Sequence, residues 1–196
     1  MNKNAEISIP SCATPVSSVE YSALTGAEQE QLLQLQQDLL ESVAQGGESA
    51  TLVNQICKLA EQSLPNSVGS VMLLDKATAL LNVYAAPSVP PEGVARLNGL
   101  QPSTGGGSCG NAVFRKAPQF VIDTFTDPRW ENMRDIAKDF NLCSCWSMPI
   151  FSTQGHVLGS FALTSFEHRS PSNFHRKLLQ IGASVIGILL DGRKVA

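Results

Sequence analysis

A hairpin signal in the C-terminal third limits the folds open to this chain more than any other feature. Two apolar runs, residues 143–151 and 156–166, flank the turn sequence Ser-Thr-Gln-Gly at 152–155. Strands joined by so short a turn pair antiparallel, because a parallel pair needs a much longer crossover. A second pair of strands is predicted for residues 68–75 and 80–86. The chain is therefore predicted to contain an antiparallel sheet.

Helical patterns flank these strands on both sides. A capping box, in which Thr25 is followed three residues later by Glu28, begins a predicted helix that ends at the glycines of residues 46–47. A second helix is predicted over about 49–63, and a long one from 170 to about 191. Helices at both ends, with hairpins between them, predict an α+β fold with one central sheet and helices grouped on one face.

The last predicted helix carries two apolar stripes, with Gly182 and Gly187 allowing another element to approach closely. The first stripe consists of Phe174, Leu178, Ile181, Val185 and Ile188, and the second of Leu179, Ala183, Ile186 and Leu190. One stripe can cover the sheet, which leaves the other for the same helix of a second chain or for the N-terminal helix. We expect a homodimer that forms through the N- and C-terminal helices.

A glycine-rich loop at residues 99–107 leads into a helix predicted over 110–116. Gly106, Gly107 and Ser108 stand where backbone N–H groups and the start of a helix could bind an anion or a carbonyl group. The loop lacks the G-x-x-x-x-G-K-[ST] phosphate fingerprint, so its glycines could equally serve a tight crossover over the sheet.

Cys109 lies at the start of that helix, where the helix dipole lowers the pKa of a thiol. A nucleophilic cysteine needs a base beside it, and the three histidines all lie in the second hairpin or near the last helix. Cys143 and Cys145 point the same way in a strand, but no second pair follows at zinc-like spacing. We therefore predict no catalytic residue and no metal site, and we expect Cys109 in the wall of a ligand pocket.

Aromatic and charged side chains supply the rest of the predicted pocket. Trp130 and Arg134 lie one turn apart on a predicted helix, Trp146 follows in the next strand, and Asp123 ends the preceding one. An arginine beside two indoles would suit an anionic or planar ligand. Alternatively, Trp130 caps the core and Arg134 pairs with a carboxylate on the surface.

Composition excludes two kinds of partner. Charged residues make up only 16% of the chain, its net charge is −3, and it lacks the clustered Lys and Arg that nucleic-acid binding needs. The longest apolar stretch, residues 178–190, is too short for a membrane helix, which needs roughly 20 residues. Five cysteines in no regular framework and a polar N-terminus without a secretion signal predict a cytoplasmic protein with free thiols.

Four motifs together carry a resemblance over roughly residues 50–191. They are Gly107-Ser108-Cys109-Gly110 followed by Ala112, Asp127-Pro128-x-Trp130, Cys145-Trp146-Ser147-x-Pro149-Ile150, and Gly155-x-Val157-Leu158-Gly159. With these motifs the chain resembles the GAF domain of bacterial signalling proteins. The resemblance implies a GAF/PAS-like antiparallel sheet of about five or six strands in the order 2-1-5-4-3. It also implies N- and C-terminal helices on one face of the sheet and a ligand cavity on the other.

The resemblance also implies a division of the chain and a function. We expect a disordered arm at 1–24, an N-terminal helix at 25–47, a GAF domain at 48–191 and a tail at 192–196. The implied function is non-catalytic sensing of an unidentified small molecule, which regulates a diguanylate cyclase, a cyclic-di-GMP phosphodiesterase or a histidine kinase. No cofactor is predicted, and haem or flavin stays open. The expected ligand-binding residues are Gly106, Gly107, Ser108, Cys109, Asp123, Trp130, Arg134 and Trp146.

Two alternatives belong to the same family resemblance. Free methionine-(R)-sulfoxide reductases are GAF enzymes that are similar to this chain at a Gly-x-Cys-Gly step, which falls on Cys109. Their acidic cluster for the substrate amine is absent here, and Cys143 and Cys145 lie in a different context, Cys-Ser-Cys-Trp. The other alternative is a module that dimerises without a ligand. Phe174 followed by His175 departs from the pattern of the members that bind cyclic nucleotides.

Overall fold

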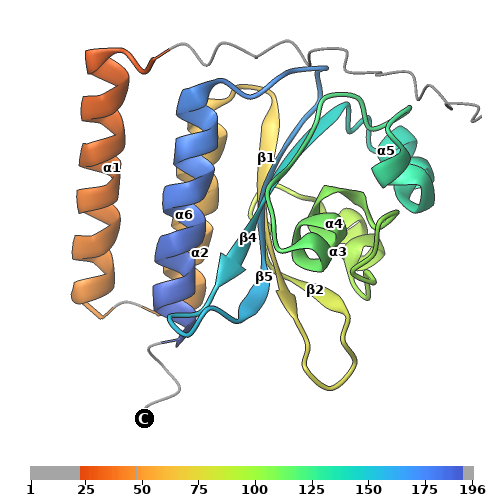
Figure 1. Cartoon of the computed structure of the whole chain (residues 1–196), viewed down its shortest axis with the longest axis horizontal. Helices are drawn as coiled ribbons and strands as arrows, with labels where there is room; N and C mark the ends of the chain where they lie inside the picture. The colour runs from red at the N-terminus through yellow and green to blue at the C-terminus, as the bar shows by residue number, and fades with distance from the viewer. Residues whose placement is uncertain (1–22, 47, 192–196) are drawn as a thin grey trace, which may run out of the picture.

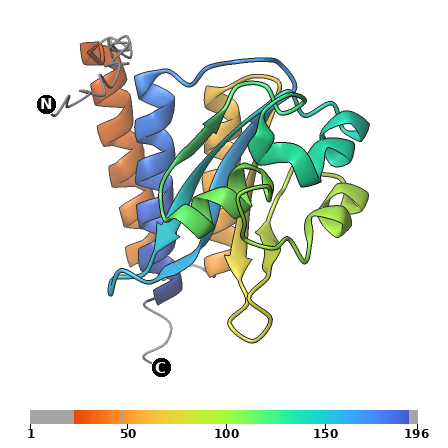
Figure 2. The same ribbon diagram turned by 45° about the vertical axis from the view of Figure 1, so that its right-hand side comes forward.

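The protein is a layered α+β structure, seen here in a computed structural model that describes residues 23–46 and 48–191. Five antiparallel strands form one sheet in the order β2-β1-β5-β4-β3, which confirms the predicted fold class and strand order. The helices α2 and α6 lie against one face of the sheet, with α1 beyond α6, whereas α3, α4 and α5 lie on the opposite side (Figure 1, Figure 2). The predicted arm and tail fall largely outside the described residues.

The bounds of the elements agree closely with the sequence pattern. The strands are β1 Ser67–Leu74, β2 Leu81–Ala85, β3 Gln119–Val121, β4 Ser144–Phe151 and β5 Val157–Ser165. The helices are α1 Gly26–Ala44, α2 Ser49–Ser63, α3 Pro91–Leu97, α4 Gly107–Arg115, the 3₁₀ helix η1 Pro128–Met133, α5 Arg134–Asp139 and α6 Asn173–Asp191. The helix α4 begins three residues before the predicted start, so the last glycine of the loop is already helical.

The second hairpin forms as the turn sequence predicts. Strands β4 and β5 pair antiparallel, with Cys145 opposite Thr164 and Ile150 opposite Gly159. The backbone N–H of Ser152 donates to the carbonyl of His156 at 2.8 Å and closes the turn. This pair occupies the centre of the sheet, and it therefore carries residues to both layers.

The helix-covered face holds the main hydrophobic core. Val53 and Ile56 of α2 meet Phe161 of β5 and Leu179 and Ile186 of α6, and none of these five is more than 3% exposed. Burial of large apolar side chains is the chief stabilising contribution in a domain of this size.

The two glycines of α6 face the sheet and α2. A Cβ on Gly182 would lie 2.6 Å from Cε1 of Phe161, and one on Gly187 would lie 2.1 Å from the backbone oxygen of Phe151. Both distances are shorter than non-bonded atoms can approach. The close approach that the sequence suggested is therefore made to the sheet and α2 within the same chain.

The N-terminal helix α1 covers the side of α6 that faces away from the sheet (Figure 1). The capping box forms, since Thr25 Oγ1 accepts from the N–H of Glu28 at 3.2 Å and the Glu28 carboxylate accepts from the N–H of Thr25 at 2.8 Å. Leu32 and Leu39 of α1 are buried at 6% exposure each. The second stripe of α6 turns Leu179 and Ile186 into the core, while Phe174 and Leu178 of the first stripe lie beside α1. One stripe thus packs beside the N-terminal helix of the same chain, as one of the two sequence interpretations held.

The predicted helix that begins at Pro128 is two shorter elements. Asp127 caps η1 by accepting from the N–H of Arg129 at 2.9 Å, and the chain then turns at Met133 into α5. Among the helices in the described part of the chain, none combines the length and the apolar character needed to cross a membrane.

Candidate functional site

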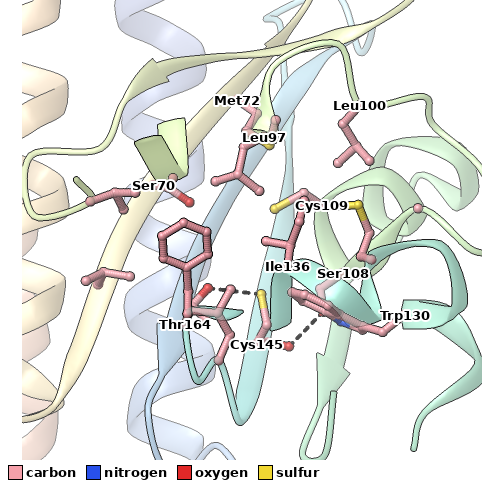
Figure 3. Close-up of a pocket in the computed structure, with 18 of the residues that line it drawn as sticks. Ser70, Met72, Leu97, Leu100, Ser108, Cys109, Trp130, Ile136, Cys145 and Thr164 are labelled. Atoms are coloured by element: carbon pink, nitrogen blue, oxygen red, sulfur yellow. Dashed lines mark hydrogen bonds between the residues drawn. The ribbon is translucent and has the colours of Figure 1, made fainter. Parts of the chain in front are cut away.

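A cavity of about 230 Å³ lies between the open face of the sheet and the crossover segments (Figure 3). Strands β1, β4 and β5 form its floor, and α3, α4, η1 and α5 form its walls. The residues that line it are Val68, Ser70, Met72, Ser88, Val89, Pro90, Gly93, Leu97, Leu100, Gly106, Gly107, Ser108, Cys109, Trp130, Met133, Ile136, Phe140, Leu142, Cys145, Thr164 and Phe166.

Strand alternation selects the floor residues. Side chains on successive residues of a strand point to opposite faces. In β1, Ser70 and Met72 therefore line the cavity, while Val71 between them packs in the helix-side core. The register that places Cys145 opposite Thr164 brings these two onto the same floor.

The lining is apolar and uncharged. None of the lining residues is Asp, Glu, Lys, Arg or His, and the polar side-chain groups are four hydroxyls, two thiols and the indole N–H of Trp130. A charged ligand would lose its hydration there without gaining a charged partner, which costs several kcal/mol or more. The cavity therefore suits a small neutral molecule that is mostly apolar.

The indole of Trp130 fixes one wall. It is 4% exposed, and its Nε1 donates to Ser108 Oγ at 3.0 Å. That hydroxyl in turn donates to the backbone oxygen of Cys145 at 2.9 Å. These two buried hydrogen bonds connect η1, the first turn of α4 and β4. They also give each of the buried polar atoms involved a hydrogen-bond partner.

The glycine loop makes room for this wall. Gly107 has a φ of +65°, which a residue with a side chain rarely adopts, and its Cα faces the Trp130 ring. At Gly106 a Cβ would lie 2.6 Å from the backbone oxygen of Gln101. Backbone conformation at Gly107 and lack of space at Gly106 therefore explain why both residues are glycine. Both also line the cavity.

Two free thiols face each other across the boundary between α4 and β4. Cys109 is half-buried and Cys145 is 2% exposed. A hydrogen bond from the Cys145 thiol lowers the pKa of Cys109, against burial, which raises it. The same interaction, together with burial, raises the pKa of Cys145. Of the two, Cys109 is the thiol that ionises first.

Five of the eight predicted ligand-binding residues line the cavity. They are Gly106, Gly107, Ser108, Cys109 and Trp130. The other three, Asp123, Arg134 and Trp146, lie elsewhere.

Trp146 lies on the opposite face of the sheet. It follows Cys145 directly in β4, so strand alternation turns its ring toward α6. Its Nε1 donates at 3.2 Å to the backbone oxygen of Arg169, in the segment that leads into α6. Its ring lies 5.4 Å from that of His175. The expectation that two indoles flank one arginine is therefore wrong.

Arg134 and Asp123 belong to the loop around η1. Arg134 Nη2 donates to the backbone oxygen of Thr126 at 3.3 Å. Asp123 accepts from the Phe125 N–H at 2.9 Å and from the Thr126 hydroxyl at 2.8 Å, and these bonds, the Thr126 hydroxyl first, lower its pKa. Both side chains organise the loop behind the cavity wall and do not line the cavity.

Sequence reasoning missed most of the floor and the wall formed by α3 and α5. Alternation in β1 and β5 was the available signal for Ser70, Met72 and Thr164. Phe140 and Leu97 carried no comparable signal, because they come from short helices whose positions depend on tertiary packing.

The described residues contain no group of three or more His, Cys, Asp and Glu side chains that could hold a metal ion. The soft ligands that line the cavity are Cys109, Cys145, Met72 and Met133, and no histidine is among the lining residues. The arrangement can bind a neutral molecule and can present a thiolate to it.

A sheet in the order 2-1-5-4-3, with terminal helices on one face and a cavity beneath a crossover on the other, defines the GAF class of fold. A model of the GAF domain family matches residues 48–191, and the chain therefore belongs to that family.

One curated relative is a sensor. The chain is 31% identical over 164 residues to the methyl sulfide methyltransferase-associated sensor of Methanosarcina acetivorans. The match covers 84% of this chain but only 16% of that relative, so the chain spans a small part of its length.

Solved GAF structures share the fold. The GAF domain of a phosphoenolpyruvate-protein phosphotransferase from Coxiella burnetii matches with a TM-score of 0.70 at 16% identity, over 84% of this chain and 96% of that one. The reduced form of fRMsr from Staphylococcus aureus matches with a TM-score of 0.64 at 17% identity, over 81% and 94%. At such identities the likeness concerns the fold alone.

Proposed function

We propose that this chain is a sensory GAF domain that binds a small neutral molecule in the cavity and regulates an output domain or protein. The observation that carries the proposal is the cavity of about 230 Å³ with no charged side chain in its lining. Ligand sites are typically concave, mostly apolar and equipped with a few polar groups. The sensor named among the relatives supports a signalling role.

The uncharged lining separates this proposal from the enzyme alternative. The fRMsr fold neighbour has been solved in complex with a substrate. Free methionine sulfoxide carries an ammonium and a carboxylate at neutral pH, and a pocket for it needs charged or hydrogen-bonding partners for both groups. The lining offers neither an acidic nor a basic side chain. The geometry of the cavity therefore favours a non-catalytic role over the enzyme alternative.

Signal transmission would use the helices on the other face. Leu33 and Leu40 of α1 are 68% and 42% exposed and lie seven residues apart, the spacing of a coiled-coil seam. They border a shallow surface groove that also includes Gln36, Gln37, Glu41 and Ala44. We propose that α1 of a second copy covers this stripe. A histidine kinase, a diguanylate cyclase or a cyclic-di-GMP phosphodiesterase would be the output that the dimer controls.

The test uses three probes of one size that differ in charge: benzyl alcohol, benzoate and benzylammonium. A ligand that binds only the folded state raises its stability in proportion to the logarithm of its concentration over Kd. We expect benzyl alcohol to raise the melting temperature and the two ions to raise it much less. Native mass spectrometry of the purified protein, run in parallel, reports both a retained ligand and the oligomeric state.

Two variants make the test specific. Ser70→Val narrows the cavity and should weaken the benzyl alcohol shift, whereas Ser184→Val, on an exposed position of α6, should not. Free methionine sulfoxide serves as the zwitterionic probe. Turnover of that compound, or equal shifts from neutral and charged probes, would overturn the proposal.

A further inference from the structure

The two thiols in the cavity wall form a pair with an asymmetric setting. Cys109 belongs to the first turn of α4 and keeps partial exposure, whereas Cys145 is buried in strand β4, which lies between β5 and β3 (Figure 3). The hydroxyl of Thr164 donates to Cys145 Sγ at 3.2 Å, and Ser108 holds the Cys145 backbone oxygen. Cys109 packs against the apolar cluster that contains Cys145, and both residues line the cavity. Both thiols thus line the cavity, Cys109 with partial exposure and Cys145 buried and held in place by its neighbours.

A second observation marks the same spot. Ser147 and Ser160 are fully buried at 0% exposure, and their hydroxyl oxygens find no hydrogen-bond partner in the described part of the chain. Strand alternation places both on the cavity face of β4 and β5, beside Cys109. Unpartnered buried hydroxyls are uncommon in folded proteins and call for an explanation. The Ser147 and Ser160 hydroxyls could donate hydrogen bonds to the Cys109 sulfur and stabilise it when it is a thiolate.

The other described cysteines lack this setting. Burial, with the Glu61 charge second, raises the pKa of Cys57 to about 12. Burial also raises the pKa of Cys143. At Cys109 the neighbouring polar side chains, Cys145 first and then Ser160 and Ser147, lower the pKa against burial, which raises it. Because the thiolate is the reactive form of cysteine, the structure ranks Cys109 above Cys57 and Cys143.

We propose that Cys109 and Cys145 are an oxidisable thiol pair that reacts with small hydroperoxides entering the cavity, Cys109 as the attacking thiol and Cys145 as the resolving one. Hydrogen peroxide is small and neutral, as the lining requires. The inference goes beyond ligand sensing, because it needs only that the cavity admits a molecule of this size and not that a resident ligand is found.

The chemistry balances in two steps. The Cys109 thiolate attacks one peroxide oxygen, the O–O bond breaks, and the leaving hydroxide takes a proton and becomes water; Cys109 is then a sulfenic acid. The Cys145 sulfur, after losing its proton, displaces hydroxide from the Cys109 sulfur, and a disulfide and a second water form. Two thiols give two electrons to one peroxide, which is reduced to two waters. The product would tie α4 to β4 through the cavity wall.

The experiment is differential alkylation followed by peptide mass spectrometry. All proteins carry Cys12→Ser, because Cys12 lies outside the described residues. After one equivalent of hydrogen peroxide, we expect an intact mass lower by two hydrogens and a peptide that links Cys109 to Cys145. Cys57 and Cys143 should remain free thiols.

Single variants assign the two roles. In Cys145→Ser, Cys109 should stop at a sulfenic acid that dimedone traps, and in Cys109→Ser, Cys145 should stay reduced. Cys143→Ser is the matched control, since it removes a buried thiol two residues from Cys145, and it should react as the parent does. Without peroxide, alkylation of Cys109 should reach half its maximal rate at a lower pH than an ordinary cysteine.

Three results would overturn the proposal. They are a disulfide with different partners, oxidation of Cys145 in Cys109→Ser, and alkylation of Cys109 no faster than that of Cys57. Whether peroxide links Cys109 to Cys145 is read from the cross-linked peptide of the parent protein, so the test works even if a variant fails to fold. The benzyl alcohol shift needs no thiol, so failure of the sensory proposal and failure of this one give different results.

Discussion

Filling the cavity should stabilise the protein, and one substitution made at two positions tests this. Ser70 and Ser147 both lie on the cavity face of the sheet, in β1 and β4. Ser70 lines the cavity and is 7% exposed, whereas Ser147 is 0% exposed and lies outside the lining. Valine in place of either serine removes a hydroxyl and adds two methyl groups. The chemical change is the same at both positions, and only the space around the side chain differs between Ser70 and Ser147.

The size of the effect follows from the cavity volume. At ~24 cal/mol per Å³, an empty cavity of about 230 Å³ lowers the free energy of unfolding by about 5.5 kcal/mol. Two methyl groups at ~0.8 kcal/mol each recover about 1.5 kcal/mol of this when they enter the space. For a domain of this length that gain raises the melting temperature by about 3–6 °C. At Ser147 the same groups meet packed atoms, and overpacking costs ~1–3 kcal/mol.

Urea unfolding of the wild type, Ser70→Val and Ser147→Val measures both effects on one scale. An unchanged m-value shows that the denatured state is comparable in all three. We expect the two variants to move the midpoint in opposite directions. If Ser70→Val destabilises the protein as much as Ser147→Val does, the space beside Ser70 is not available, and the argument for a ligand cavity loses its basis.

Three further predictions concern the helices and the loop. Gly182→Ala should lower the free energy of unfolding by ~1–3 kcal/mol in urea titrations, because its Cβ would lie 2.6 Å from Phe161. Hydrogen bonds from Arg129 lower the pKa of Asp127 below the ordinary carboxyl value. The pair therefore stabilises the fold above that ordinary value and loses this effect as the pH falls through the pKa of the folded state. The difference in free energy of unfolding between wild type and Arg129→Gln should disappear over that fall in pH. Leu33→Glu should shift a dimer to monomers in sedimentation analysis without lowering the melting temperature of the monomer, since Leu33 is 68% exposed.

The sequence was sufficient for the fold because its signals are local. The turn at 152–155 determines which strands pair, and the capping box at Thr25 begins α1 at the predicted residue. The helix start at 107 was placed late, because Gly107 was taken as part of the loop. These signals depend on backbone geometry over a few residues, and tertiary packing leaves them unchanged.

The site was predictable only in part, for a physical reason. Cys109 and Ser108 could be placed because a helix start is readable from sequence, and Trp130 because it follows a helix cap. Trp146 was misplaced because the side of the sheet it faces depends on the strand register, and a shift of one residue exchanges the two faces. Residues that α3 contributes, such as Leu97, required the three-dimensional path of the crossover.

The alternation that misled the prediction for Trp146 also suggests how a cavity could act on the helices. In β4, Cys145 faces the cavity, whereas the next residue, Trp146, faces α6. Its indole donates to the backbone just before α6, and its ring lies beside that of His175. One strand therefore touches both layers through neighbouring side chains. A ligand can shift α6 only by the difference in its affinity for two positions of that strand. Because the strand contacts α4 through Ser108 and His175 of α6 through Trp146, a change in the cavity wall has a path of contacts to α6. The helix α1, which carries the proposed dimer surface, packs against α6 in turn.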